Sequence, residues 1–379
     1  MARPESLAAV VADKRRIEMR RFPIPEPLDD DGILRVELCG ICGSDYHYYT
    51  EGEHWPYQLP PQILGHEVVG RIDKIGHHAE RNWRVKEGDL VIVESAVTCG
   101  RCRYCLTGNA SLCSNKQSYG MSASMNNPPH LWGGYSQYMY LHPRVILHAV
   151  PPGVEAHAAV LFSALANGVK WAERIPRLRL GDSIVILGPG QQGLGCVLAS
   201  SMTGANPIIV AGLERDAKRL AVAKELGATH AIVYETAPLV DQVKNILGAE
   251  MADIVVDVTG STDAQRAAVD LVRRGGTVVL AGRTPNKVVA LVLDKLSARG
   301  ITLVGARAHE SEDVRRAIAV ISARREQLSK LLTHELPLLE ADRALRLIGQ
   351  EISGEEAIHV ALNPWIGQSF AGRDESNQS

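Results

Sequence analysis

Four of the seven cysteines lie close together in the pattern Cys-x2-Cys-x2-Cys-x7-Cys, at Cys99, Cys102, Cys105 and Cys113. In a reducing compartment such a cluster indicates metal binding rather than disulfides. Four thiolates can close a tetrahedral site around Zn²⁺ and leave no position for water, which is typical of a structural zinc. An iron–sulfur cluster and free thiols are the alternatives. A nucleic-acid-binding zinc ribbon is not expected, because the sequence has no basic stripe and no second paired knuckle.

A glycine-rich turn follows an apolar run and opens a helix, with the residues Gly188, Pro189, Gly190, Gln191, Gln192 and Gly193. Its first glycine permits a tight turn, and its second lets the backbone approach a pyrophosphate. The third allows close packing of helix on strand, while the helix N-terminus supplies N–H groups and a positive dipole. Alone the motif is weak evidence. Here a strand, a helix and five further strands surround it, so we predict a dinucleotide-binding turn.

The end of the second strand decides between NAD and NADP. The acid that would bind the ribose hydroxyls is expected at Gly212, which has no side chain. Nearby, Glu214 or Asp216 could take the ribose and favour NAD, or these residues could simply form a solvated helix start. Bases that could instead pair with the 2′-phosphate of NADP are Arg215, Lys218 and Arg219. We expect NAD, with NADP as the alternative; the predicted cofactor-binding set also includes Thr259, Ala281 and Gly282.

From about residue 180, strand-like apolar runs alternate with helical segments. The predicted strands are Ser183–Leu187, Ile208–Ala211, Ala231–Tyr234, Ile254–Val258, Thr277–Ala281 and Ile301–Val304. Continuous apolar strands in β-α alternation predict a parallel sheet covered on both faces, in a doubly wound α/β fold. Apolar residues at helical spacing predict a helix over Asp216–Leu226, ended by Gly227, and a charged helix is expected over 313–332.

Residues 1 to about 160 have a different sequence pattern. Short apolar runs are separated by turn residues, which predicts a partly open β-barrel with long loops. The runs are Leu7–Val11, Ile33–Leu38, Val68–Ile72 and Leu90–Val93. Because 379 residues exceed the roughly 250–300 that one core supports, we expect two domains. We predict a catalytic domain over 1–162, with the cysteine lobe at 95–115 and a completing segment at 305–379, and a dinucleotide-binding domain over 163–304.

Composition excludes several classes of protein. Hydrophobic residues make up 45% of the chain and charged residues 22%, as in ordinary globular proteins. The net charge of −2 gives no reason to expect a nucleic-acid partner. No apolar run approaches the roughly 20 residues that span a bilayer, and no signal peptide is recognisable. We therefore expect a cytoplasmic protein without a membrane partner, with a polar, disordered tail from Gly372.

Two further segments stand upstream of the cysteine lobe. They read Cys39-Gly40-Ile41-Cys42-Gly43-Ser44-Asp45-Tyr46-His47 and Gly65-His66-Glu67. With the lobe and the glycine turn in this order and spacing, nearly the whole chain resembles the zinc-containing medium-chain dehydrogenases, the polyol and sorbitol branch especially. The resemblance implies a GroES-like barrel, a Rossmann sheet of six parallel strands, a small-molecule alcohol or ketone substrate, and a homodimer or homotetramer.

The resemblance also implies roles for single residues. Cys42 and His66 match ligands of a catalytic zinc, and Glu67 lies beside the metal as a ligand or as a supporting carboxylate. Ser44 matches the hydroxyl that receives the alcohol proton, His47 the group that passes it to solvent, and Asp45 an acid that supports the metal site. Zinc with an open position lowers the pKa of a bound alcohol, and the resulting alkoxide expels hydride to the nicotinamide.

The pattern departs from the family at one place. The third zinc ligand of the family is usually Cys, Glu or Asp, and the matching position here is Ser163. A neutral serine is a poor zinc ligand, so zinc held by Cys42, His66, Glu67 and water is favoured over a weakened zinc or a water-mediated contact of Ser163. The departure motivates a second function, a zinc-poor NAD(P)H-dependent reductase of an activated double bond or carbonyl. A non-enzymatic cofactor-binding protein would not need this set of residues.

Substrate shape is indicated only by aromatic and apolar residues near the motifs. They are Tyr46, Tyr48, Tyr49, His54, Trp55, Tyr119 and Met121. If some of them line the cleft, a cyclic or otherwise apolar secondary alcohol fits better than a long open polyol. The alternative is that they cover the backbone of the loops. Cys39 and Cys196 lie in apolar runs and are expected to be small core residues.

Overall fold

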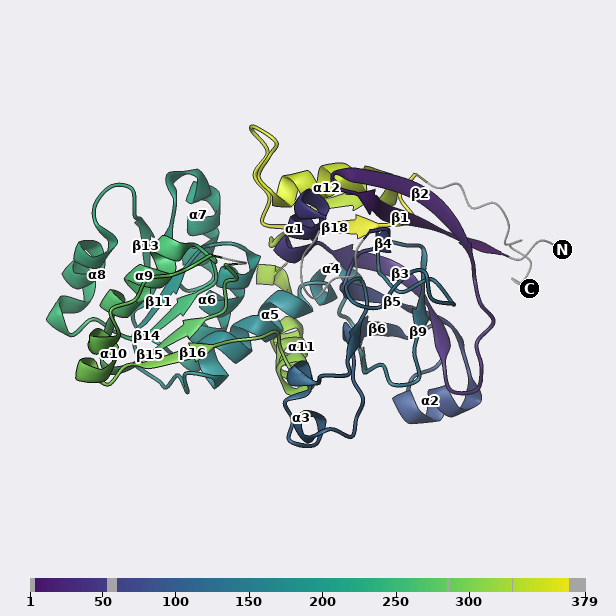
Figure 1. Cartoon of the computed structure of the whole chain (residues 1–379), viewed down its shortest axis with the longest axis horizontal. Helices are drawn as coiled ribbons and strands as arrows, with labels where there is room; N and C mark the ends of the chain where they lie inside the picture. The colour runs from purple at the N-terminus through teal and green to yellow at the C-terminus, as the bar shows by residue number, and fades with distance from the viewer. Residues whose placement is uncertain (1–3, 53–59, 285–286, 329, 368–379) are drawn as a thin grey trace. The chain divides into compact units, whose positions relative to one another are not determined.

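The computed structural model describes residues 4–52, 60–284, 287–328 and 330–367 (Figure 1). The backbone forms two compact units. The first contains the described parts of Met1–Gly100, Ser114–Val160 and Leu332–Ser379, and the second those of Arg101–Cys113 and Leu161–Leu331. In the described part of the chain, no helix has the length and apolar character needed to cross a membrane. The predicted α/β class is confirmed.

The first unit is built on β-sheets. A three-stranded sheet has the order β2-β1-β4, and a seven-stranded sheet has the order β10-β6-β5-β3-β18-β17 with β9 paired to β3. The strands are β1 Glu5–Asp13, β2 Arg16–Pro23, β3 Gly32–Gly40, β4 Gln62–Ile63, β5 Glu67–Ile75, β6 Leu90–Val93, β7 Ala96–Val97, β8 Gln117–Ser118, β9 Tyr138–Leu141, β10 Leu147–Ala149, β17 Leu332–Pro337 and β18 His359–Asn363. The helices are α1 Gly43–Glu51, α2 His77–Trp83, α4 Ala156–Ala159, η5 Leu338–Glu340 and α12 Ala341–Ile348.

Pairing of β3 with β5 brings two distant motifs together. The strands run antiparallel, with Cys39 opposite Val68 and Gly40 opposite Glu67. Apolar residues of both strands, among them Val36 and Ile72, are buried in one core with β1 and β6. Burial of this face fixes the register, because a slip by one residue would turn the apolar side chains outward. The end of β3 therefore lies beside the start of β5.

The second unit contains a parallel six-stranded sheet in the order β13-β12-β11-β14-β15-β16, as predicted. Its strands are β11 Ile184–Leu187, β12 Ile208–Gly212, β13 His230–Val233, β14 Ala252–Asp257, β15 Val272–Leu280 and β16 Thr302–Gly305. Its helices are α3 Arg103–Leu106, η1 Ala110–Leu112, α5 Phe162–Gly168, η2 Val169–Arg174, α6 Gln191–Thr203, η3 Glu214–Asp216, α7 Ala217–Glu225, α8 Leu239–Leu247, η4 Gly248–Glu250, α9 Thr262–Leu271, α10 Leu293–Arg299 and α11 Ser311–Leu328. The order reverses between β11 and β14, and such a switch point is where doubly wound sheets bind ligands.

Both faces of this sheet are covered. Val185 and Ile209 share a buried cluster with Val243 of α8 and Ala268 of α9. The alternate residues of the same strands, such as Ile186, are equally buried, so helices also cover the opposite face. The sheet therefore has the two apolar faces that its continuous apolar strands predict.

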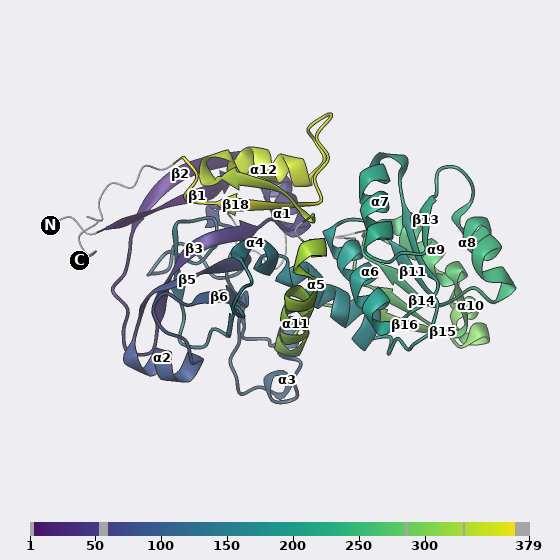
Figure 2. The ribbon, with the colours of Figure 1, turned by 180° about the vertical axis from the view of Figure 1, so that it is seen from behind.

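The expected boundary at residue 305 is wrong, because 305–331 belong with the second unit. Helix α11 packs against α5 and η2, and both views show α11 beside α5 (Figures 1 and 2). The charged helix predicted over 313–332 is α11, and Leu332 begins β17 instead. The assignment of one unit to catalysis and the other to cofactor binding stays a prediction.

Helices α5 and α6 approach each other at glycines. A Cβ added at Gly195 would lie 2.3 Å from the carbonyl oxygen of Ala164, and one at Gly168 would lie 2.3 Å from the carbonyl carbon of Gly195. Real Cβ atoms do not reach such distances to backbone, so the two helices can pack this closely only without side chains at these positions.

We expect Gly195→Ala to lower the free energy of unfolding by about 1–3 kcal/mol, because the added methyl forces α5 and α6 apart. The matched control is Gly305→Ala, since a Cβ at Gly305 meets no atom of the described residues within 4 Å. That change should stay within about 0.5 kcal/mol of the wild type. Urea denaturation of the full chain measures both, and equal stabilities of the two variants would contradict the close helix contact.

Candidate functional site

The four cysteines of the lobe gather at one point. Their sulfur atoms all lie within 4.8 Å of one another, and the Sγ atoms of Cys102 and Cys105 are 3.5 Å apart. Zinc–sulfur bonds of about 2.3 Å would place tetrahedral sulfurs about 3.8 Å apart. The cluster therefore fits a closed zinc site. Cys39 and Cys196 lie elsewhere and are buried, which confirms them as core residues, and burial raises the pKa of the Cys196 thiol to about 12.

A second cluster joins Cys42, His66 and Glu67. One donor atom from each lies within 4.8 Å of the others. Cys42 precedes α1, while His66 and Glu67 stand at the start of β5, so the β3–β5 register brings them together. Glu67 and the His66 ring are buried, and Cys42 is partly exposed. A thiolate, an imidazole and a carboxylate are ligands of catalytic zinc sites, so this donor set fits the metal.

Asp45 organises the second cluster. Its buried carboxylate accepts the Cys42 backbone N–H at 3.1 Å and the Tyr135 hydroxyl at 3.2 Å. Its other oxygen is 3.2 Å from Nδ1 of His66, so Nε2 is the ring nitrogen that could bind a metal. Burial lowers the pKa of His66, but the charge and hydrogen bond of Asp45, with the contribution of Cys42, outweigh it and raise the pKa well above its ordinary value. Asp45 thus orients the His66 ring and raises its pKa.

Gly40 separates Glu67 from a buried histidine. A Cβ at Gly40 would lie 2.8 Å from Oε2 of Glu67 and 2.8 Å from Nε2 of His359, so glycine is needed for both to approach. Burial disfavours a charged imidazole and lowers the pKa of His359 to about 4. The Glu67 carboxylate therefore has a neutral imidazole as its neighbour.

Ser44 and His47 lie on α1, directly after Cys42. The side chain of His47 is half exposed, and its Nδ1 is 3.5 Å from a carboxylate oxygen of Glu51. Ser163 lies in α5 of the second unit and is buried. Its role at the metal stays a prediction.

The glycine turn has the geometry that its sequence predicts. Gly188 has a φ of +103°, which favours glycine. A Cβ at Gly193 would lie 1.8 Å from the Gly188 carbonyl oxygen, so the third glycine is needed for the helix to pack on the turn. At Gly190 a Cβ would meet no described atom within 4 Å. The turn is therefore open at its second glycine, before the N-terminus of α6, where a pyrophosphate would bind.

The predicted residues at the ends of β14 and β15 are close to each other and to the turn. Asp257, fully buried, accepts hydrogen bonds from the backbone and hydroxyl of Thr259, and its backbone carbonyl accepts those of Ala281 and Gly282. The Thr259 methyl would be 2.7 Å from a Cβ at Gly188. The structure thus brings four predicted residues together at the carboxyl ends of β11, β14 and β15: Gly188, Thr259, Ala281 and Gly282.

The candidates after β12 separate into two groups. Asp216 and Arg219 are buried and paired at 3.2 Å, and Asp216 also accepts the Leu213 N–H at 3.1 Å. These two side chains serve the local fold, while Lys218 is exposed. By contrast, Glu214 and Arg215 line a hollow of about 480 Å³, together with Leu213 and Glu235. The backbone N–H of Glu214 donates to the Glu235 carboxylate. At Gly212, a Cβ would lie 2.8 Å from Pro189 of the glycine turn.

The tyrosines near the catalytic motif contact other parts of the first unit. Tyr46 donates to Glu351 at 2.6 Å, and Arg15 makes two hydrogen bonds to the same carboxylate. Tyr49 donates to Asp342, and its ring is buried. Tyr119 accepts the backbone N–H of His142 at 2.8 Å. Of these contacts, that of Tyr119 is to backbone and those of Tyr46 and Tyr49 are to carboxylates, so whether the aromatic residues line a cleft stays a prediction. His54 and Trp55 lie outside the described residues.

Sequence reasoning did not find His359, Asp257 or Glu235. Asp257 had a signal, because it is an acid at the end of an apolar strand. Glu235 similarly follows β13, next to the β12 end. His359 had no local signal, because only the pairing of β18 with β3 brings it near Gly40.

Comparison with known proteins finds two matching family descriptions. Residues 29–152 match the family "Alcohol dehydrogenase GroES-like domain" and residues 193–323 match "Zinc-binding dehydrogenase". A probable alcohol dehydrogenase of Mycobacterium tuberculosis is 34% identical over 372 residues, covering 94% of this chain and 98% of the relative. A sorbitol dehydrogenase of Bacillus subtilis is 33% identical over 299 residues, covering 79% and 81%. The crystal structure of an alcohol dehydrogenase from Thermotoga maritima has a TM-score of 0.85 and 28% identity, covering 95% of this chain and 99% of its own.

We expect Glu351→Gln to lower the free energy of unfolding near neutral pH. The difference from the wild type should become smaller as the pH falls. Hydrogen bonds from Arg15 and Tyr46 lower the pKa of Glu351 to about 2, below the ordinary value of 4.5. Because the folded pKa is lowered, the wild-type advantage is fully present above about pH 4.5 and is lost as the pH falls toward 2. Urea titrations of both proteins at several pH values measure the difference. A difference independent of pH would contradict the prediction.

Proposed function

Because the chain belongs to the zinc-containing medium-chain dehydrogenase family, we propose that it transfers hydride between a secondary alcohol, cyclic or polyol-like, and a nicotinamide cofactor. The observation that carries the proposal is the meeting of Cys42, His66 and Glu67 donor atoms within 4.8 Å, at the start of the helix that holds Ser44. Hydride transfer needs the reacting carbon and the cofactor in contact. A protein that only binds the cofactor would not need three metal-donor side chains close to a serine in the chain.

Cys42 and His66 would hold the catalytic zinc, with Glu67 as a further ligand or as a supporting carboxylate. When bound, zinc supplies Lewis acidity that makes an alcohol easier to deprotonate near neutral pH. Asp45 keeps Nδ1 of His66 occupied and so presents the other ring nitrogen. Ser163 would stay outside the ligand set, as the sequence predicts, because a serine hydroxyl binds zinc weakly.

Ser44 and His47 would carry the alcohol proton to solvent. The Ser44 hydroxyl is short and uncharged, which suits it to accept one proton and donate another. His47 lies three residues further along α1, and its half-exposed ring can exchange protons with water. Nδ1 of the His47 ring lies 3.5 Å from the Glu51 carboxylate, one turn further along α1.

The dinucleotide would bind across the open edge of the parallel sheet. Gly188, Gly190 and Gly193, with Gln191 and Gln192 in the first turn of α6, would hold the pyrophosphate. Thr259, Ala281 and Gly282 would line the path toward the nicotinamide. The hollow after β12 would take the adenosine ribose, and its two carboxylates favour NAD over the extra phosphate of NADP.

The homodimer or homotetramer implied by the family resemblance remains part of the proposal. A small-molecule substrate suffices for the proposed reaction. A panel of secondary alcohols is needed to identify the substrate.

We expect Cys42→Ala to lose one of two zinc ions per chain and to lower alcohol-dependent cofactor reduction by roughly three orders of magnitude or more, because the Lewis acid is lost. Metal analysis and a panel of secondary alcohols measure both effects. Cys196→Ala, which removes a buried thiol of α6, is the control and should keep both zinc ions. Turnover retained by Cys42→Ala would instead favour the zinc-poor reductase.

We expect Glu235→Gln and Glu214→Gln each to raise the ratio of kcat/KM for NADP over that for NAD by about tenfold, because Arg215 then faces the 2′-phosphate with fewer opposing charges. Steady-state kinetics with both cofactors at low ionic strength measure the ratio. Glu250→Gln, an exposed carboxylate in η4, should leave it unchanged. A wild-type protein with a higher kcat/KM for NADP than for NAD would overturn the proposed preference for NAD.

A further inference from the structure

The cysteine lobe has almost no core of its own. Helix α3 contributes no buried residue, and Leu106 and Leu112 are 74% and 45% exposed. Ser111 is the buried residue of η1, with 7% of its surface exposed. A loop of this kind needs an anchor other than apolar packing to keep its cysteines in place.

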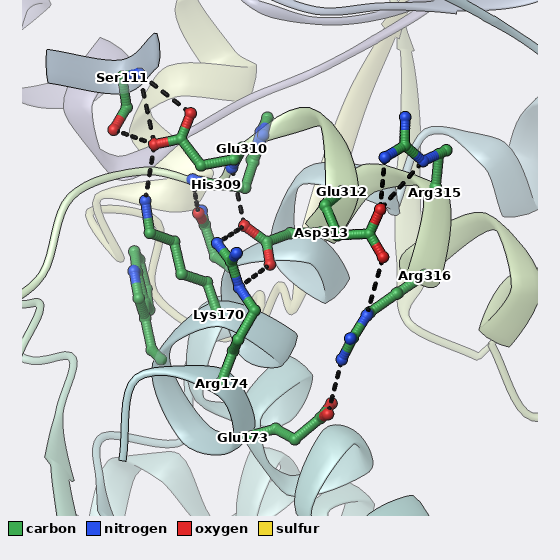
Figure 3. A network of polar contacts seen from close by, with 12 residues as sticks. Ser111, Lys170, Glu173, Arg174, His309, Glu310, Glu312, Asp313, Arg315 and Arg316 are labelled. Atoms are coloured by element: carbon green, nitrogen blue, oxygen red, sulfur yellow. Dashed lines mark hydrogen bonds and ion pairs between the residues drawn. The ribbon is translucent and has the colours of Figure 1, made fainter. Parts of the chain in front are cut away.

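Ser111 is anchored by a carboxylate from a distant part of the chain. Its backbone N–H donates to Oε2 of Glu310 at 3.0 Å, and its hydroxyl donates to Oε1 (Figure 3). Glu310 stands just before α11 and is itself buried, with 7% exposure. Both residues belong to the second unit, so the contact lies within one compact body.

The charge of Glu310 is balanced by Lys170 of η2. The Lys170 ammonium lies 3.1 Å from Oε1 of Glu310, and it also donates to the Ala308 carbonyl at 2.7 Å. The backbone N–H of Glu310 donates to Asp313 at 2.8 Å, and Arg174 pairs with the same Asp313 (Figure 3). Glu310 is thus held through both its backbone and its side chain.

One helical stretch holds the whole segment before α11. Trp171 donates to the Arg307 carbonyl at 2.8 Å, and the Asn167 side chain accepts the His309 N–H at 2.8 Å. The Asn167 amide also donates to Gln192 of the glycine turn at 3.0 Å. With Lys170, these side chains come from one face of α5 and η2. The segment that presents Glu310 to the lobe is therefore held by hydrogen bonds at several consecutive residues.

We propose that Glu310 is the positioning residue of the four-cysteine lobe. By accepting both hydrogen bonds of Ser111, it holds the chain between Cys105 and Cys113 in the conformation that binds metal. The Lys170 ammonium, 3.1 Å from Oε1, holds the Glu310 carboxylate in place. The inference rests on the lobe zinc of the proposed function. It predicts that replacing Glu310 first increases the rate at which that zinc is released.

The test measures zinc release from the full chain to a chromogenic chelator. The Cys42→Ala background leaves the lobe as the remaining zinc site, and metal analysis of this protein comes first. One zinc per chain is required; none would overturn the lobe site itself, independently of Glu310. We expect Glu310→Gln to release this zinc at least about tenfold faster and Ser111→Ala several-fold faster. The matched control is Glu312→Gln, because the Glu312 side chain is half exposed and pairs with Arg315 and Arg316.

A second variant separates positioning of the lobe from general destabilisation. Glu310→Gln with Lys170→Met also removes the buried ammonium that has lost its carboxylate partner, so the Tm of the double variant should recover toward the wild-type value while its zinc release stays fast. If both Tm and zinc retention recover together, Glu310 serves only the general fold and the proposal is overturned. Zinc release by Glu310→Gln equal to that of Glu312→Gln would overturn it as well.

Discussion

Gly40 stands opposite Glu67 in the antiparallel pairing of β3 with β5, and the meeting of the Cys42, His66 and Glu67 donor atoms depends on this register. Cys42 follows one strand and His66 precedes the other, so each ligand is placed by backbone rather than by flexible side chains. Asp45, in the first turn of α1, then ties Cys42 and His66 to one carboxylate. A slip of the register by one residue would separate the donors and also turn the apolar residues of both strands to the wrong face.

In the second unit, too, a few backbone and side-chain contacts position the predicted sites. The reversal of strand order between β11 and β14 opens one edge of the sheet, and the glycine turn lies there with the Asp257 network. Helix α5 supports this edge through Asn167, and its continuation η2 supports the segment that contacts the cysteine lobe. One buried helical stretch thus orders residues that belong to the predicted cofactor site and to the predicted structural zinc site.

Much of this arrangement could be predicted from short-range patterns. Continuous apolar runs identify the six parallel strands, and the glycine spacing identifies the turn, because both reflect local backbone and burial requirements. The cysteine spacing identifies its own cluster for the same reason. His359 and Glu310 could not be found in this way, since each acts through a partner more than a hundred residues away in the chain. The boundary at residue 305 failed similarly, because the packing of α11 on α5 has no signal in either segment alone. Asp216 and Arg219 are candidate cofactor ligands by sequence, but in the structure they are buried and form an i,i+3 ion pair with each other, a local contact that their spacing permits.

The proposed reaction transfers hydride from an alcohol carbon to the nicotinamide with the help of zinc. Its most direct test uses a secondary alcohol that carries deuterium on the carbinol carbon, turned over with the oxidised cofactor and analysed by NMR of the reduced product. We expect deuterium at C4 of the nicotinamide, and no such transfer after the zinc has been removed. A reduced cofactor without deuterium, or equal labelling by the zinc-free protein, would contradict it.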